Sequence, residues 1–117
     1  MNKLELIAEN IKNNKLDEAL KLCKNYEEVE DRKIINNFLG VIHFTKKDLT
    51  KAEKFFLKAI EIDDKFQDPI RNLCVIFTIT KKFQKLLNYS DKLYNLDNRN
   101  PLNIFQIGSA NELNKNY

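Results

Sequence analysis

The sequence is poor in the residues that turn a chain sharply. Its 117 residues include only two glycines and two prolines. A β-protein needs frequent turns and so more of both, whereas helices joined by short loops do not. We therefore expect an all-helical chain that forms a single domain over residues 1–117.

Histidine and cysteine are also scarce, which limits the chemistry that the chain can support. The only histidine is His43, so a metal site with two histidine ligands is excluded. Gly40 and Gly108 are isolated and form no glycine-rich phosphate loop. Cys23 and Cys74 lie far apart, without a C-x-x-C motif, and are predicted to be buried free thiols in a reducing compartment. We expect no catalytic, cofactor or metal site, and no enzymatic activity.

Long apolar runs and a strong net charge are absent as well. No run approaches the length of a membrane span, and Lys3, Glu5 and Glu9 interrupt the apolar pattern of the N-terminus. If Met1 is the natural start, a cytoplasmic location follows, with no membrane partner. A net charge of +3 is too small to indicate a nucleic-acid surface. Only the excess of lysine favours nucleic-acid binding, which would show a steep dependence on salt.

What the sequence does contain is a repeat with a period of 34 residues. The pair Leu39-Gly40, a large apolar residue followed by a small one, recurs as Leu73-Cys74 and again as Ile107-Gly108. The N-terminal third fits with one residue missing from its loop, Ile7-Ala8 supplying the pair and residues 16–19 matching residues 49–52. The predicted repeats are residues 1–32, 33–66, 67–100 and a partial repeat, 101–117.

Within the repeats, apolar residues recur at spacings of three and four, as in an amphipathic helix. This pattern predicts helices over residues 3–13, 16–26, 31–45, 49–62, 69–80, 83–96 and 101–115. Asp68-Pro69 and Asn100-Pro101 are predicted helix starts, each a capping side chain followed by a proline. Asn14 is predicted to take the left-handed conformation in the first loop.

Residues 33–66 carry Leu39-Gly40 in the first predicted helix and Ala52, Phe56 and Ala59 in the second. This pattern resembles the tetratricopeptide repeat, in which small residues let two helices approach closely beside an aromatic ring. Residues 67–100 depart from it at the same positions, which hold Leu86, Ser90 and Leu93, so that hairpin is expected to open or shift. The resemblance implies an α-α superhelix, a solenoid of antiparallel helix hairpins with about seven helices.

The resemblance also implies a function and a surface. Such solenoids bind a peptide or partner protein in a concave groove lined by the first helix of each hairpin, and so serve as scaffolds. By this analogy ten positions face the groove: Glu5, Glu9, Asn37, Val41, Phe44, Arg71, Val75, Thr78, Phe105 and Ser109. Six of them are the predicted partner-binding residues: Asn37, Val41, Arg71, Val75, Phe105 and Ser109. The 34-residue period would place Val41 beside Val75, as an apolar floor, and Asn37 beside Arg71. Arg71 would hold an acidic group and Asn37 a peptide backbone, so the expected ligand is a short segment with an apolar anchor flanked by acid.

Two alternatives stay open, and both come from the last predicted helix. One side of it carries Ile104 and Ile107, and another carries Leu102, Phe105 and Leu113. A terminal helix of a solenoid is expected to have a polar outer face. Residues 101–117 are therefore either a surface for homodimerisation or the point at which a longer repeat protein continues.

Overall fold

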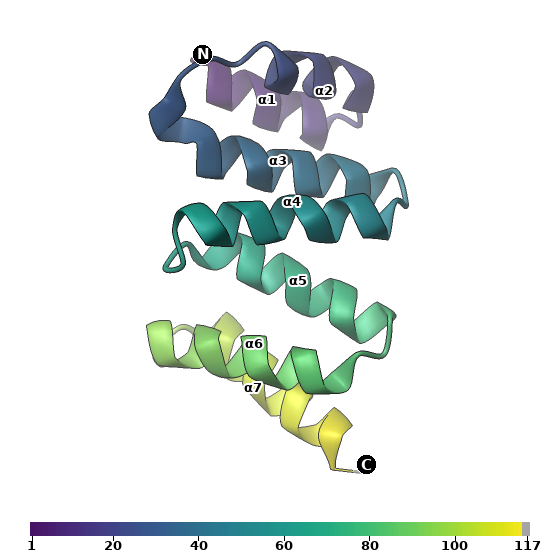
Figure 1. Cartoon of the computed structure of the whole chain (residues 1–117), viewed down its shortest axis with the longest axis vertical. Coiled ribbons are helices and arrows are strands. Elements are labelled where there is room, and N and C mark those ends of the chain that lie inside the picture. The colour runs from purple at the N-terminus through teal and green to yellow at the C-terminus, as the bar shows by residue number, and fades with distance from the viewer. Residues whose placement is uncertain (116–117) are drawn as a thin grey trace. The chain divides into compact units, whose positions relative to one another are not determined.

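The structure, a computed structural model, describes residues 1–115 and contains no strand in that range. It has seven α-helices and one short 3₁₀ turn, Val29–Asp31 (Figure 1). The helices are α1 Lys3–Lys12, α2 Leu16–Lys24, α3 Arg32–Thr45, α4 Leu49–Ile62, α5 Gln67–Ile79, α6 Phe83–Leu96 and α7 Pro101–Asn114. The prediction of an all-α chain of seven helices is confirmed.

Three of the loops between helices close in the same way. Each has one residue in the left-handed region: Asn14 with φ 59°, Lys47 with φ 68° and Lys81 with φ 60°. The next residue donates its N–H to a carbonyl five positions back: Lys15 to Asn10 over 2.8 Å, Asp48 to His43 over 2.9 Å, and Lys82 to Phe77 over 2.9 Å. This is the Schellman closure of a helix end, and it confirms the prediction for Asn14.

The loops also correct the register of the first repeat. Asn14 precedes Lys47 by 33 positions, so the residue of α1 that corresponds to Gly40 is Ile7. Ile7 is buried, whereas Ala8 is exposed. The prediction that Ala8 is the small packing residue was wrong, because the α1–α2 loop is not the shortened one. The missing residue lies after α2, in the connection that contains the 3₁₀ turn.

Of the two predicted cap-and-proline starts, one is confirmed and one is wrong. The side chain of Asn100 accepts the N–H of Leu102 at 2.9 Å, and Pro101 is the first residue of α7. Helix α5 instead begins at Gln67, and Asp68 lies inside its first turn. There the Asp68 carboxylate accepts from Arg71 Nη2 at 2.7 Å and does not cap the helix.

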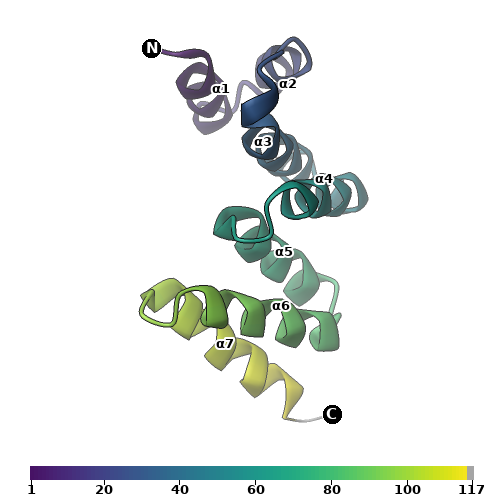
Figure 2. The same cartoon turned by 60° about the vertical axis from the view of Figure 1, so that its left-hand side comes forward.

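Residue contacts group the chain into two compact units, Met1–Asp63 and the part from Asp64 onward. In the first unit α1 packs on α2, α2 on α3 and α3 on α4, and α1 also contacts α3 (Figure 2). Gly40 of α3 is buried against Phe56 of α4, and a Cβ atom on Gly40 would lie only 2.3 Å from Phe56 Cε1. Ala52 and Ala59, which belong to α4 like Phe56, are fully buried. The predicted close approach of this hairpin is confirmed.

In the second unit α5 packs on α6 and α6 on α7, and α5 also contacts α7. At the positions of Gly40 and Phe56 this unit has Cys74 and Ser90, whose Sγ and Oγ atoms lie 3.6 Å apart in the interior. Leu86 and Leu93 are fully buried. The departures from the repeat pattern are thus complementary to one another, because a larger residue on α5 faces a smaller one on α6.

The unit boundary falls close to the predicted repeat boundary at residues 66 and 67. The single domain over residues 1–117 stays a prediction. Among the described helices, none has both the length and the apolar character that a membrane crossing requires.

Both thiols are free and buried, as predicted, one in each unit. Burial raises the pKa of Cys23 to about 11, and it does the same for Cys74 although a hydrogen bond with Ser90 lowers the pKa of Cys74 slightly. At neutral pH both thiols are therefore protonated, and both pack in the interior.

Candidate partner-binding surface

The six predicted partner-binding residues are divided between the two units. Asn37 and Val41 belong to α3 of the first unit, whereas Arg71 and Val75 belong to α5, and Phe105 and Ser109 to α7, of the second. The predicted placement of Val41 beside Val75 and of Asn37 beside Arg71 stays a prediction.

Asn37 does not suit the role given to it. Its side chain is buried, with 8% of the residue exposed. A buried amide takes part in the packing of the interior and is not available to a peptide backbone. The sequence pattern could not show this, since the same face of α3 carries the half-buried Val41 one turn later.

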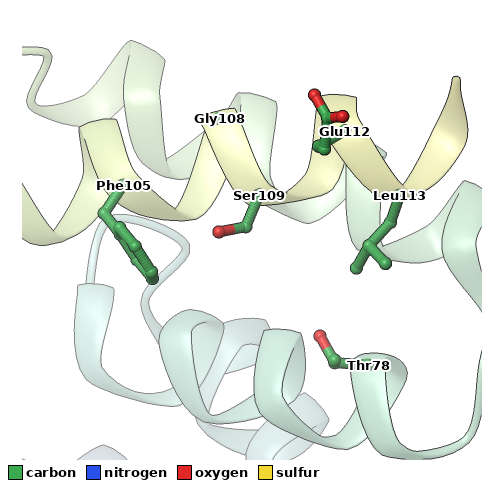
Figure 3. A pocket seen from close by; sticks show the side chains of 6 residues that line it. All are labelled: Thr78, Phe105, Gly108, Ser109, Glu112 and Leu113. Atoms are coloured by element: carbon green, nitrogen blue, oxygen red, sulfur yellow. The ribbon is translucent and has the colours of Figure 1, made fainter.

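The second unit has a pocket between α5 and α7, the two first helices of their repeats. Phe105, Ser109 and Leu113 project from α7 toward α5, and Thr78 faces them (Figure 3). Their spacing of four residues places the three α7 side chains on one face. Gly108 and Glu112 complete the lining, and the cavity has a volume of about 640 Å³. The structure therefore brings Phe105 and Ser109 together at one site.

Most of this surface is apolar and open. Phe105 is 73% exposed, and Val75 and Ile79, which flank Thr78 along α5, are 45% and 53% exposed. The Thr78 hydroxyl donates to the Cys74 carbonyl at 2.8 Å, so its oxygen can still accept a hydrogen bond. Glu112 adds a carboxylate, which is paired at 3.4 Å with Lys115. Aromatic and aliphatic groups beside a few polar atoms are typical of a surface that binds another protein.

Arg71 forms hydrogen bonds within its own unit, and the partner contact expected of it stays a prediction. Its Nη1 donates to Asn103 Oδ1 at 3.2 Å and its Nη2 to Asp68 Oδ1 at 2.7 Å. Asn103 is fully buried and donates in turn to Gln67 at 2.9 Å and to the Leu93 and Asp97 carbonyls at 3.2 Å. Arg71 thus joins α5 to α7 through Asn103, and its guanidinium is engaged within the unit.

The same network explains which face of α7 packs inward. The sequence places Ile104 and Ile107 on one apolar side of this helix, but Ile104 is 48% exposed and the buried residues of α7 are Asn103 and Ala110. A buried asparagine is acceptable there because its amide is fully hydrogen-bonded. Counting apolar residues alone could not identify this face.

Two features of the pocket were only partly visible in the sequence. Leu113 was assigned to the same stripe as Phe105, and the structure confirms that both line one cavity. Glu112 was not predicted, although its position seven residues after Phe105 was a signal that it lies on the same side of the helix.

No protein-family model matches the chain, and no curated protein sequence matches it either.

Proposed function

We propose that this chain is a protein-interaction module of the tetratricopeptide-like kind, without enzymatic activity, which binds a peptide or partner segment on the α5–α7 face. The observation that carries the proposal is the apolar pocket lined by Phe105, Ser109 and Leu113. Phe105 is 73% exposed beside this pocket, and an exposed large apolar side chain of this kind commonly marks an interaction surface. A cytoplasmic role as a scaffold or adaptor would suit the two reduced, buried thiols.

The chemistry of the pocket indicates the kind of ligand. Phe105 and Leu113 favour an apolar or aromatic anchor, while Thr78 and Ser109 offer hydroxyls to a peptide backbone. Arg71 is held by Asp68 and Asn103, so an acidic anchor on this face is not expected. The proposed ligand is therefore an extended or helical segment with an apolar anchor. It keeps the apolar anchor expected from the sequence but not the acidic groups that were expected to flank it.

The test is selection of binding peptides by display on the full chain, followed by synthesis and calorimetry of the selected peptides. Phe105→Ser should weaken their binding by about tenfold or more, since few residues carry most of the energy of an interface. Tyr94→Ser is the matched control, because Tyr94 is an exposed aromatic residue on α6 outside the pocket. Peptides that bind Phe105→Ser as tightly as the unmodified chain would contradict the proposal.

Self-association is the second candidate, and one observation favours it. Leu102 and Ile104 of α7 are 62% and 48% exposed and do not line the pocket. If these side chains pair two chains, sedimentation velocity should show a dimer that Leu102→Ser dissociates. A monomer at millimolar concentration would leave peptide binding as the proposed function.

A further inference from the structure

The first unit has a second pocket, made by α2, α3 and α4, which plays no part in the proposed function. Its volume is about 390 Å³. The floor is apolar and is formed by Leu20 of α2, Leu39 of α3 and Phe55 of α4. The His43 ring stacks on the Phe55 ring with centroids 5.3 Å apart and an angle of 5° between the planes.

Four lysines surround this floor: Lys24, Lys51, Lys54 and Lys58. Lys51, Lys54 and Lys58 lie at spacings of three and four, so they share one face of α4. Lys24 stands in the last turn of α2, where a cation is favoured by the helix dipole. The four cations converge because α2 and α4 both contact α3.

None of the four pocket lysines belongs to an ion pair among the described residues. No carboxylate is among the side chains that line it in the described chain. Lys46 and Lys33, in contrast, are paired with Asp17 and Asp63 elsewhere in the unit. Lys58 Nζ lies over the Phe55 ring, 5.3 Å from its centroid. Four like charges around one pocket raise the local electrostatic potential and attract an anion.

We propose that this pocket is a docking site for an acidic segment of a partner protein. An apolar side chain of that segment would rest on Leu20 and Leu39, beside the Phe55 ring, and carboxylates on either side of it would pair with the lysines. A protein segment suits the pocket better than a nucleic acid does. Phe55 already has His43 stacked on it and Lys58 over it, so it offers no free platform for a base.

His43 provides a built-in reporter, since the chain has no other histidine. Burial, followed by the nearby Lys51, lowers the pKa of His43 below its usual range, although Asp48 acts in the opposite direction. A carboxylate bound among the lysines would favour the imidazolium form and raise that pKa. NMR of the imidazole protons therefore detects occupancy of this pocket without a label.

The probe is a capped heptapeptide with a central Phe between two groups of three Glu, added to the full chain. We expect saturable shifts of the His43 resonances, a raised His43 pKa, and binding that weakens by about tenfold between 50 and 300 mM salt. Lys54→Glu should weaken binding by about tenfold, because it puts a like charge at the centre of the site. Lys12→Glu is the control with the same change of net charge, since Lys12 lies on α1 outside the pocket, and should alter binding less than about twofold.

Several results would overturn the proposal. Unchanged His43 resonances, or equal binding by Lys54→Glu and the unmodified chain, would show that the acidic peptide does not occupy this pocket. Equal binding of a heptapeptide with Gly in place of Phe would show that the apolar floor has no role. Tighter binding of a single-stranded oligonucleotide of equal charge, lost in Lys54→Glu, would assign the site to nucleic acid. Circular dichroism confirms that each variant is folded, and Phe105→Ser, which serves the other surface, should bind this peptide normally.

Discussion

At the scale of the residue, two glycines with the same place in the repeat have opposite surroundings. A Cβ atom on Gly40 would meet three atoms of the Phe56 ring at 2.3 to 2.7 Å, whereas one on Gly108 would have nothing within 4 Å. Phe56 is buried, so its ring cannot swing aside freely. Gly108 has no such partner in the described chain because no second helix packs across it.

This difference makes a paired prediction. Gly40→Ala should lower the free energy of unfolding by about 1–3 kcal/mol, because the overpacking outweighs the better helix propensity of alanine. Gly108→Ala should raise it by up to about 1 kcal/mol, since only the propensity changes. Urea denaturation measures both. A Gly40→Ala protein as stable as the unmodified chain would mean that α3 and α4 are further apart than described.

The pKa of His43 gives a second prediction at this scale. Burial lowers the pKa of His43 in the fold relative to its unfolded value near 6.5, and the charged groups around it are Lys24, Lys46, Asp48 and Lys51. The unfolded chain then binds more protons as pH falls below about 6.5, so the fold loses stability there. Thermal melts from pH 7.5 to 5 should show this loss, and His43→Phe should reduce it. A melting temperature independent of pH over this range would contradict the described burial of His43.

At the scale of the element, the loops depend on three residues with positive φ that are not glycine. Lys81→Gly should stabilise the α5–α6 hairpin by about 0.5–1 kcal/mol, because glycine takes the left-handed conformation without the Cβ clash that lysine suffers. Lys81→Ala keeps the clash while removing the charge, and so it should not stabilise. If the alanine variant gained as much as the glycine variant, charge and not backbone conformation would be the cause.

The buried Asn103 gives a prediction for how α5, α6 and α7 hold together. Its side chain bonds Arg71, Gln67 and two carbonyls at the end of α6. Asn103→Leu removes these bonds and leaves polar groups unpaired, so the free energy of unfolding should fall by about 2–3 kcal/mol. Asn88→Leu on the exposed side of α6 should have little effect. A neutral Asn103→Leu would show that α7 is held mainly by its apolar contacts.

The elements themselves were largely predictable, whereas their inward faces were not. Apolar spacing and loop chemistry located all seven helices, because amphipathic periodicity and the left-handed loop residue are local properties. The role of Asn103 depends on carbonyls in α6 and side chains in α5, which no local pattern records. For the same reason the pocket residues Phe105 and Leu113 were found, but Asn37 was assigned to a surface when it is buried.

At the scale of the whole molecule, the two units each carry one buried thiol. Neither Cys23 nor Cys74 should react with a thiol reagent at neutral pH until its surroundings open, because burial keeps both protonated and covered. Gly40→Ala destabilises the unit that contains Cys23 and not the unit that contains Cys74. The substitution should therefore speed the labelling of Cys23 more than the labelling of Cys74. Mass spectrometry of each cysteine peptide measures the two rates. Equal acceleration of both would show that the chain opens as one unit.

The small residue of the close contact lies on the first helix in one hairpin, as Gly40 against Phe56, and the second helix carries the smaller residue in the other, as Ser90 against Cys74. This difference limits which sequence changes the chain can accept during evolution. A first helix from one hairpin cannot be combined with a second helix from the other: Cys74 opposite a phenylalanine would collide, and Gly40 opposite a serine would leave a hole. Two hairpins that share a period are therefore not interchangeable parts. Recombination within this gene would be tolerated only where the crossover falls between hairpins. Substitutions at the contact between the two helices of a hairpin would have to occur in pairs.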